Sequence, residues 1–183
     1  MLAASCKTPK ITTGPDLSGK HFHKVFQSGC WGMEAAYSIY ANDSIGTRDW
    51  NDGEGNGSYP MLLWDNDSLY SLWTYDKYGG DPFVKHIYGN HRGTYEYDEA
   101  SHLFKIKGFS FMAFWKNLKE FEIISINDEE MKCKGERFRL VDRNDDAVKC
   151  LFIFKHYDEN KKQNWKQKMI DDANDTEYMN NKQ

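Results

Sequence analysis

The stretch KEFEIISINDEEMKCKGERF (residues 119–138) decides the fold class. Two runs of alternating apolar and polar residues flank the turn sequence NDEE (127–130), and in the first run Glu122 separates Phe121 from Ile123. A period of two places such apolar side chains on one face of a strand, while Asn and Asp stabilise turns through their own backbone. The stretch therefore predicts an antiparallel β-hairpin with one face against a core.

Other parts of the chain repeat this pattern. Two more hairpins are predicted at 59–75 and 94–108, and single strands are predicted at 20–27, 33–41 and 148–157. The segment 48–60 is rich in Gly, Asn and Asp and is predicted to be a loop. About eight to ten short strands in an up-and-down meander, with helical spacing only near the C-terminus, predict an all-β sandwich or barrel.

Composition is compatible with one aromatic-rich domain. Aromatic residues make up 15% of the 183 residues, which supplies much buried area per residue. The net charge is -4, and the sequence lacks the excess of Lys and Arg that is typical of nucleic-acid-binding proteins, so a nucleic-acid partner is not expected. No apolar run reaches the roughly 18 residues of a membrane-spanning helix.

The chain divides into three predicted parts. Residues 1–16 form a leader remnant and a flexible tether, and 17–157 form the β-barrel domain. Residues 158–183 form a polar tail that is predicted to be partly helical, because Trp165, Met169 and Ala173 recur every four residues.

The N-terminal sequence Ala3-Ala4-Ser5-Cys6 resembles the end of a bacterial lipoprotein signal peptide. Small residues lead up to a cysteine that would be acylated after cleavage, and a Pro/Thr/Gly-containing tether follows. We therefore expect Cys6 to carry a lipid that anchors the domain to a membrane. This predicts a cell-envelope location, on the outer membrane and facing the periplasm or the exterior.

Cys133 and Cys150 flank a predicted hairpin, which raises the question of a disulfide. A turn around Arg143-Asn144 would place Cys133 opposite Phe154. Cys150 would then lie four residues along the neighbouring strand, beyond the roughly 7 Å that a disulfide allows between Cα atoms. Thiols are therefore expected, although a bulge or a wider turn would permit the bond.

Several motifs together carry a resemblance to a known family. They are L-x-G-K (Leu17, Gly19, Lys20), G-x-Y-x-Y-D (93–98) and FEIISINDEEM (121–131). The chain resembles the lipocalin-like, calycin-type β-barrel domains of small bacterial lipoproteins. The resemblance implies an eight-stranded up-and-down barrel or a half-open barrel, whose first strand begins near Leu17, with no catalytic residues. First strands of this family commonly begin with G-x-W, whereas Lys20 and His21 follow Gly19 here.

Aromatic side chains from consecutive predicted strands are the candidate ligand-binding residues. An eight-stranded barrel has room for its own side chains or for one small ligand, so plain core packing is the alternative. The candidates are Trp64, Trp73, Tyr75, Tyr95, Tyr97, Phe104, Phe114 and Trp115.

No metal site or cofactor is predicted. His21 and His23 would share one face of a strand, but a polar outer face explains them without a metal. The loop 49–54 fails the calcium-loop pattern, because Gly53 stands where the fifth position needs an oxygen ligand.

The sequence thus favours a non-enzymatic lipocalin-like lipoprotein domain that binds a small apolar or amphipathic ligand. One alternative is a protein- or glycan-interaction module at the cell envelope, with Trp50 in the 48–60 loop as a contact. Another is an enzyme that uses an open barrel mouth. The ligand and the oligomeric state stay open.

Overall fold

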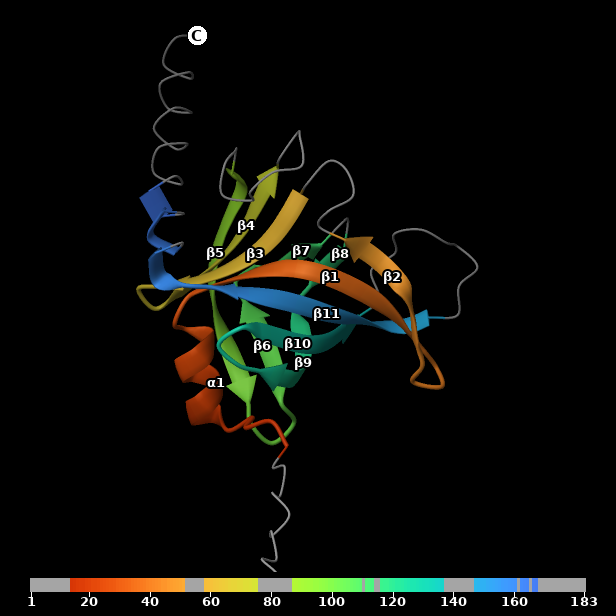
Figure 1. The fold of residues 1–183 in the computed structure, drawn as a ribbon. Helices are drawn as coiled ribbons and strands as arrows, with labels where there is room; N and C mark the ends of the chain where they lie inside the picture. The colour runs from red at the N-terminus through yellow and green to blue at the C-terminus, as the bar shows by residue number, and fades with distance from the viewer. Residues whose placement is uncertain are drawn as a thin grey trace, which may run out of the picture.

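A computed structural model describes residues 14–51, 58–75, 87–109, 111–113, 116–136, 147–160, 162–164 and 166–167. One helix precedes a series of antiparallel strands (Figure 1). The elements are α1 (Gly19–Phe26), β1 (Cys30–Tyr40), β2 (Ile45–Asn51), β3 (Ser58–Asp65), β4 (Ser68–Tyr75), β5 (Ile87–Asp98), β6 (Leu103–Lys107), β7 (Phe111–Ala113), β8 (Lys116–Leu118), β9 (Glu120–Ile126), β10 (Glu130–Glu136) and β11 (Ala147–Tyr157).

Eight of the described strands close a barrel. Their order around the ring is β1, β3, β4, β5, β6, β9, β10 and β11, and β11 returns to pair with β1. The β1–β11 pairing runs from Cys30 opposite Tyr157 to Tyr40 opposite Ala147. On its other edge β1 pairs first with β3 and then with β2, while β7 and β8 form a separate hairpin between β6 and β9. The predicted all-β barrel is confirmed.

All three predicted hairpins are present, and their turns use Asn and Asp as expected. Asn66 and Asp67 join β3 to β4 with φ values of 44° and 57°, in the left-handed region that these residues tolerate. At the β9–β10 turn the Asn127 side chain accepts backbone hydrogen bonds from Glu129 at 2.8 Å and Glu130 at 2.9 Å.

The strand predicted at 20–27 is wrong, because this segment forms helix α1. Phe22, Val25 and Phe26 are buried together, which is the i, i+3, i+4 spacing of an amphipathic helix. Ser18 caps the helix, since its side chain accepts a hydrogen bond from a first-turn backbone N–H at 3.4 Å.

Two finer expectations also need correction. The Leu17, Gly19 and Lys20 pattern lies at the start of α1, so the first strand of the barrel begins instead at Cys30. Within the predicted 48–60 loop, β2 extends to Asn51 and β3 begins at Ser58, because pairing with β1 and β4 overrides the turn-forming composition.

The register between β10 and β11 differs from the expected one by two residues. Cys133 lies opposite Phe152 rather than Phe154, and Cys150 lies opposite Gly135. Both cysteines are buried thiols, as expected, and no disulfide joins them.

Helix α1 seals the end of the barrel that holds the β5–β6 and β9–β10 turns (Figure 1). The Tyr97 hydroxyl donates to the Leu17 carbonyl at 2.9 Å, and His21 Nε2 lies 3.3 Å from the Ile126 carbonyl oxygen. The core combines the buried face of α1 with inward-facing residues of the ring. Its largest fully buried members are Trp31, Phe22, Phe26, Phe104, Phe152, Phe154, Met33 and Leu62.

The chain turns helical again after β11, at residues 159–160, 162–164 and 166–167. Lys166 Nζ lies 2.8 Å from Asp65 Oδ2, which joins this segment to the end of β3. Trp165, which suggested this helix, lies outside the described residues. None of the described helices combines the length and apolar character that a membrane crossing requires.

Candidate functional site

Four of the eight candidate aromatic residues come together inside the barrel. Trp64 and Tyr95 meet edge to face with ring centroids 4.9 Å apart, and Tyr95 lies 5.3 Å from Phe104. Tyr97 follows Tyr95 on the same face of β5. The side chains of Trp73, Tyr75, Phe114, Trp115 and Trp50, and all of Cys6, lie outside the described residues.

These aromatic rings pack against α1. Phe22 stacks on Tyr97 with ring centroids 3.9 Å apart, and Phe26 lies 4.9 Å from Tyr95 and 5.0 Å from Phe104. Because these rings pack against one another and against the apolar face of the helix, the four described candidates form core at this end of the barrel.

Polar groups inside this cluster are paired. The Tyr95 hydroxyl accepts a hydrogen bond from Gln27 Nε2 at 2.9 Å and lies 2.8 Å from His23 Nδ1. Burial raises the pKa of Tyr95 to about 12, so the phenol is protonated at neutral pH.

The two histidines that sequence analysis singled out have separate partners. His21 contacts the Ile126 carbonyl, whereas His23 contacts Tyr95, because residues two apart on a helix point in different directions. In the part of the chain that the structure describes, no three His, Cys, Asp or Glu side chains gather as a metal site would require.

The role of Trp31 as a buried contact between α1 and β11 was not predicted from the sequence. This side chain is fully buried, its indole Nε1 donates to the Phe26 carbonyl at 3.0 Å, and its ring lies 4.6 Å from that of His156. Two residues earlier, a side chain at Gly29 would collide with the Tyr157 carbonyl. Gly29 and Trp31 were the sequence features that could have indicated this role. They mark the junction between the end of α1 and the start of β1.

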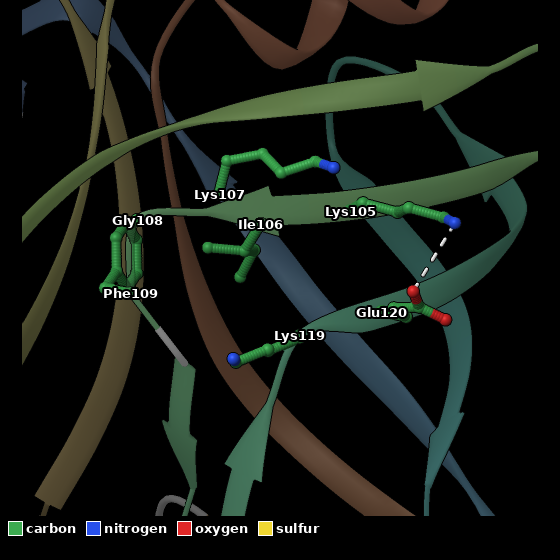
Figure 2. A pocket seen from close by; sticks show the side chains of 7 residues that line it. All are labelled: Lys105, Ile106, Lys107, Gly108, Phe109, Lys119 and Glu120. Carbon is green, nitrogen blue, oxygen red and sulfur yellow. Dashed lines mark ion pairs between the residues drawn. The ribbon is translucent and has the colours of Figure 1, made fainter.

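A pocket of about 520 Å³ lies in the barrel wall where β6 and β9 diverge (Figure 2). The two strands pair only as far as Lys105 opposite Glu120. Beyond that point one hydrogen bond holds them, from Ile106 N to the Lys119 carbonyl at 2.7 Å, and the chain leaves β6 toward the β7–β8 hairpin. The pocket is lined by Lys105, Ile106, Lys107, Gly108, Phe109, Lys119 and Glu120.

The lining of the pocket is mainly polar, and Ile106 and Phe109 form a smaller apolar base. Ile106 is buried in the core, and Phe109 is half-buried against it. On the rim, Lys105 Nζ lies 3.4 Å from Glu120 Oε1. This combination suits a molecule that has both an apolar and a polar part.

Two glycines allow the chain to form this pocket. Gly108 has a φ of +89°, a conformation that other residues rarely adopt. A side chain at Gly93 on β5 would collide with the Lys107 carbonyl and with the Phe109 ring. The end of β6 can therefore cross β5 closely and seat Phe109 against the core.

Comparison with protein-family models, curated proteins and solved structures found no match. The geometry of the chain itself is therefore the basis for assigning a function. Of the features described, the β6–β9 pocket is where an apolar base and charged side chains surround an open volume.

Proposed function

We propose that this barrel is a non-enzymatic binding protein for a small amphipathic molecule, which it holds in the β6–β9 pocket. The observation that carries the proposal is the pocket itself, about 520 Å³ in volume, with Ile106 and Phe109 at its base. Small-molecule sites commonly enclose roughly 300–1,000 Å³ and combine apolar walls with a few polar groups.

The resemblance to lipocalin-like barrels supports this proposal. In the described chain, an N-terminal helix seals a closed antiparallel ring of eight strands. Gly29 directly precedes the first strand of that ring, and Gly29-Cys30-Trp31 matches the G-x-W pattern that is absent after Gly19. Barrels of this size hold one small ligand or fill their interior with side chains. Because α1 fills the sealed end, we place the ligand in the wall pocket.

Amide chemical shifts test this location. Decanoic acid and decanol, titrated into the labelled protein, should shift the signals of residues 105–109 and 119–120 and leave α1 unchanged. Shifts confined to Trp64, Tyr95 and α1 would move the ligand to the barrel interior, and no shift with either compound would overturn the proposal.

A variant pair tests the apolar base. Phe109→Ala removes the aromatic wall and should weaken decanol binding by about tenfold, given the apolar area lost. Leu151→Ala is the control, because Leu151 is similarly half-buried but lies on β11, away from the pocket. Thermal midpoints of both variants separate lost affinity from lost stability. Equal affinity of Phe109→Ala and the parent protein would contradict the location.

We also propose that a lipid on Cys6 tethers the barrel to the cell envelope. The support is the Ala3-Ala4-Ser5-Cys6 sequence and the Pro/Thr/Gly-containing segment after it. Expression from the full gene with a labelled fatty acid should label the protein, and Cys6→Ser should abolish the label. An unlabelled parent protein would refute the tether.

A further inference from the structure

We infer that the β6–β9 pocket selects a ligand with a single anionic head group, and that Lys119 is the residue that binds this group. The inference rests on the proposed function and adds the chemical class of the ligand. It is an amphiphile whose apolar chain lies on Ile106 and Phe109 and whose carboxylate faces Lys119.

Two of the three ammonium groups at the pocket have carboxylate partners. The three belong to Lys105, Lys107 and Lys119. Lys105 pairs with Glu120 at 3.4 Å and Lys107 pairs with Glu96 at 2.9 Å. Within the described part of the chain, the Lys119 side chain has no ion pair. Lys119 is therefore the pocket ammonium that no carboxylate of the described residues neutralises.

A backbone hydrogen bond holds Lys119 at the pocket, while its side-chain amine is accessible to solvent. Lys119 joins β8 to β9, and its carbonyl accepts the hydrogen bond from Ile106 at 2.7 Å. The residue is exposed. Figure 2 shows its amine pointing away from Glu120, toward the side of the pocket where Phe109 lies. A head group bound there can meet the amine without displacing either existing ion pair.

The charge of the ligand follows from this arrangement. The Lys119 ammonium can pair with one carboxylate of a ligand. A second negative charge on the ligand would have to break the ion pair of Lys105 or of Lys107. Hydrogen bonds to charged groups are stronger than neutral ones, although solvent exposure weakens them. We therefore expect the head-group charge to contribute about five- to tenfold in affinity.

Calorimetric titration of the full chain with matched ligands tests the inference. The ligands are decanoic acid, decanol, decylamine and acetate, and the proteins are the parent, Lys119→Gln, Lys119→Arg and Lys24→Gln. Lys24 is the control because it is exposed on α1 and, among the described residues, likewise forms no ion pair. The parent should bind decanoate about five- to tenfold more tightly than decanol, and decylamine more weakly still.

The variants assign this preference to a residue. Lys119→Gln should bind decanoate and decanol equally, while Lys119→Arg and Lys24→Gln should keep the preference of the parent. Retained preference in Lys119→Gln would overturn the role of Lys119.

The ligand series separates the two proposals. Equal binding of decanoate and decanol by the parent would overturn anion selection and leave the proposed function intact. Binding of acetate as tight as decanoate would show a site for the anion alone and overturn the amphiphile. No binding of any compound would overturn both proposals.

Discussion

Tyr95 connects the barrel to the α1 segment through both its ring and its hydroxyl. Its ring packs among Phe26, Trp64 and Phe104, while its hydroxyl accepts the Gln27 hydrogen bond. A phenol in this position contributes apolar area and pairs with the part-buried side chain of Gln27, the C-cap residue of α1. Its ionisation would place a negative charge in the aromatic core.

We predict that stability falls at alkaline pH because of Tyr95. Burial raises its pKa in the folded protein from 10.0 to about 12, whereas the unfolded chain retains the ordinary value. Between these values the unfolded state releases the proton and the folded state retains it, so the free energy of unfolding decreases as pH rises. Denaturant titrations across this pH window measure the decrease.

Tyr95→Phe is the matching variant, and it should flatten the pH dependence while losing the hydrogen bond. Burial also raises the pKa of Tyr97, so part of the slope should persist in this variant. An unchanged slope in Tyr95→Phe would assign the effect to other groups.

Among the elements, α1 is held by its aromatic face. Phe22 is fully buried and stacks on Tyr97 and Phe26. We predict that Phe22→Ala lowers the free energy of unfolding by about 3–5 kcal/mol, the usual effect of truncating a buried Phe. Urea denaturation followed by circular dichroism measures it. Phe22→Leu keeps most of the apolar volume and should lose under about 1.5 kcal/mol. Similar small losses in both variants would mean that α1 contributes little to the core.

The β3–β4 turn offers a stabilising substitution. Asp67 has a φ of 57°, which glycine adopts without strain. Asp67→Gly should raise the free energy of unfolding by about 0.5 kcal/mol, since relief of strain is partly offset by greater flexibility of the unfolded chain. Asp67→Val should lower it, because a β-branched residue resists this conformation. Thermal unfolding compares the three proteins, and a stable Asp67→Val would contradict the turn geometry.

Local patterns explain which elements could be predicted from sequence. The hairpins were predictable because alternation and Asn/Asp turns act over a few residues, as at Asn127. Helix α1 was missed although Phe22, Val25 and Phe26 carried helical spacing, because the surrounding residues also alternate. Ser18 was the overlooked sign of a helix start.

At the scale of the whole molecule, the reactivity of three buried cysteines can measure how often the protein unfolds. Cys30, Cys133 and Cys150 lie buried on β1, β10 and β11, and burial raises the pKa of the Cys133 thiol. We predict that in a Cys6→Ser protein all three react with a thiol reagent only as fast as the molecule unfolds. Mass spectrometry of the labelled sites measures this. Faster labelling of one cysteine under native conditions would reveal local opening of its strand.

The candidate site could not be predicted from sequence because three-dimensional contacts create it. In the sequence, Lys105 and Lys107 are simply polar positions of a predicted strand. Lys119 lies outside the predicted 94–108 hairpin that contains them. Their convergence depends on where β6 and β9 stop pairing and on the close crossing at Gly93. Similarly, the aromatic set was identifiable by residue type, but its packing against α1 needed the position of the helix.

The seam between β1 and β11 has a consequence for synthesis on the ribosome. Cys30 pairs with Tyr157, 127 positions later (157 minus 30), so the ring can close only after the last strand has left the exit tunnel. Hairpins such as β3–β4 can form earlier, but one edge of β1 stays unpaired until β11 emerges. During that interval the nascent chain exposes a strand edge with which neighbouring chains can pair.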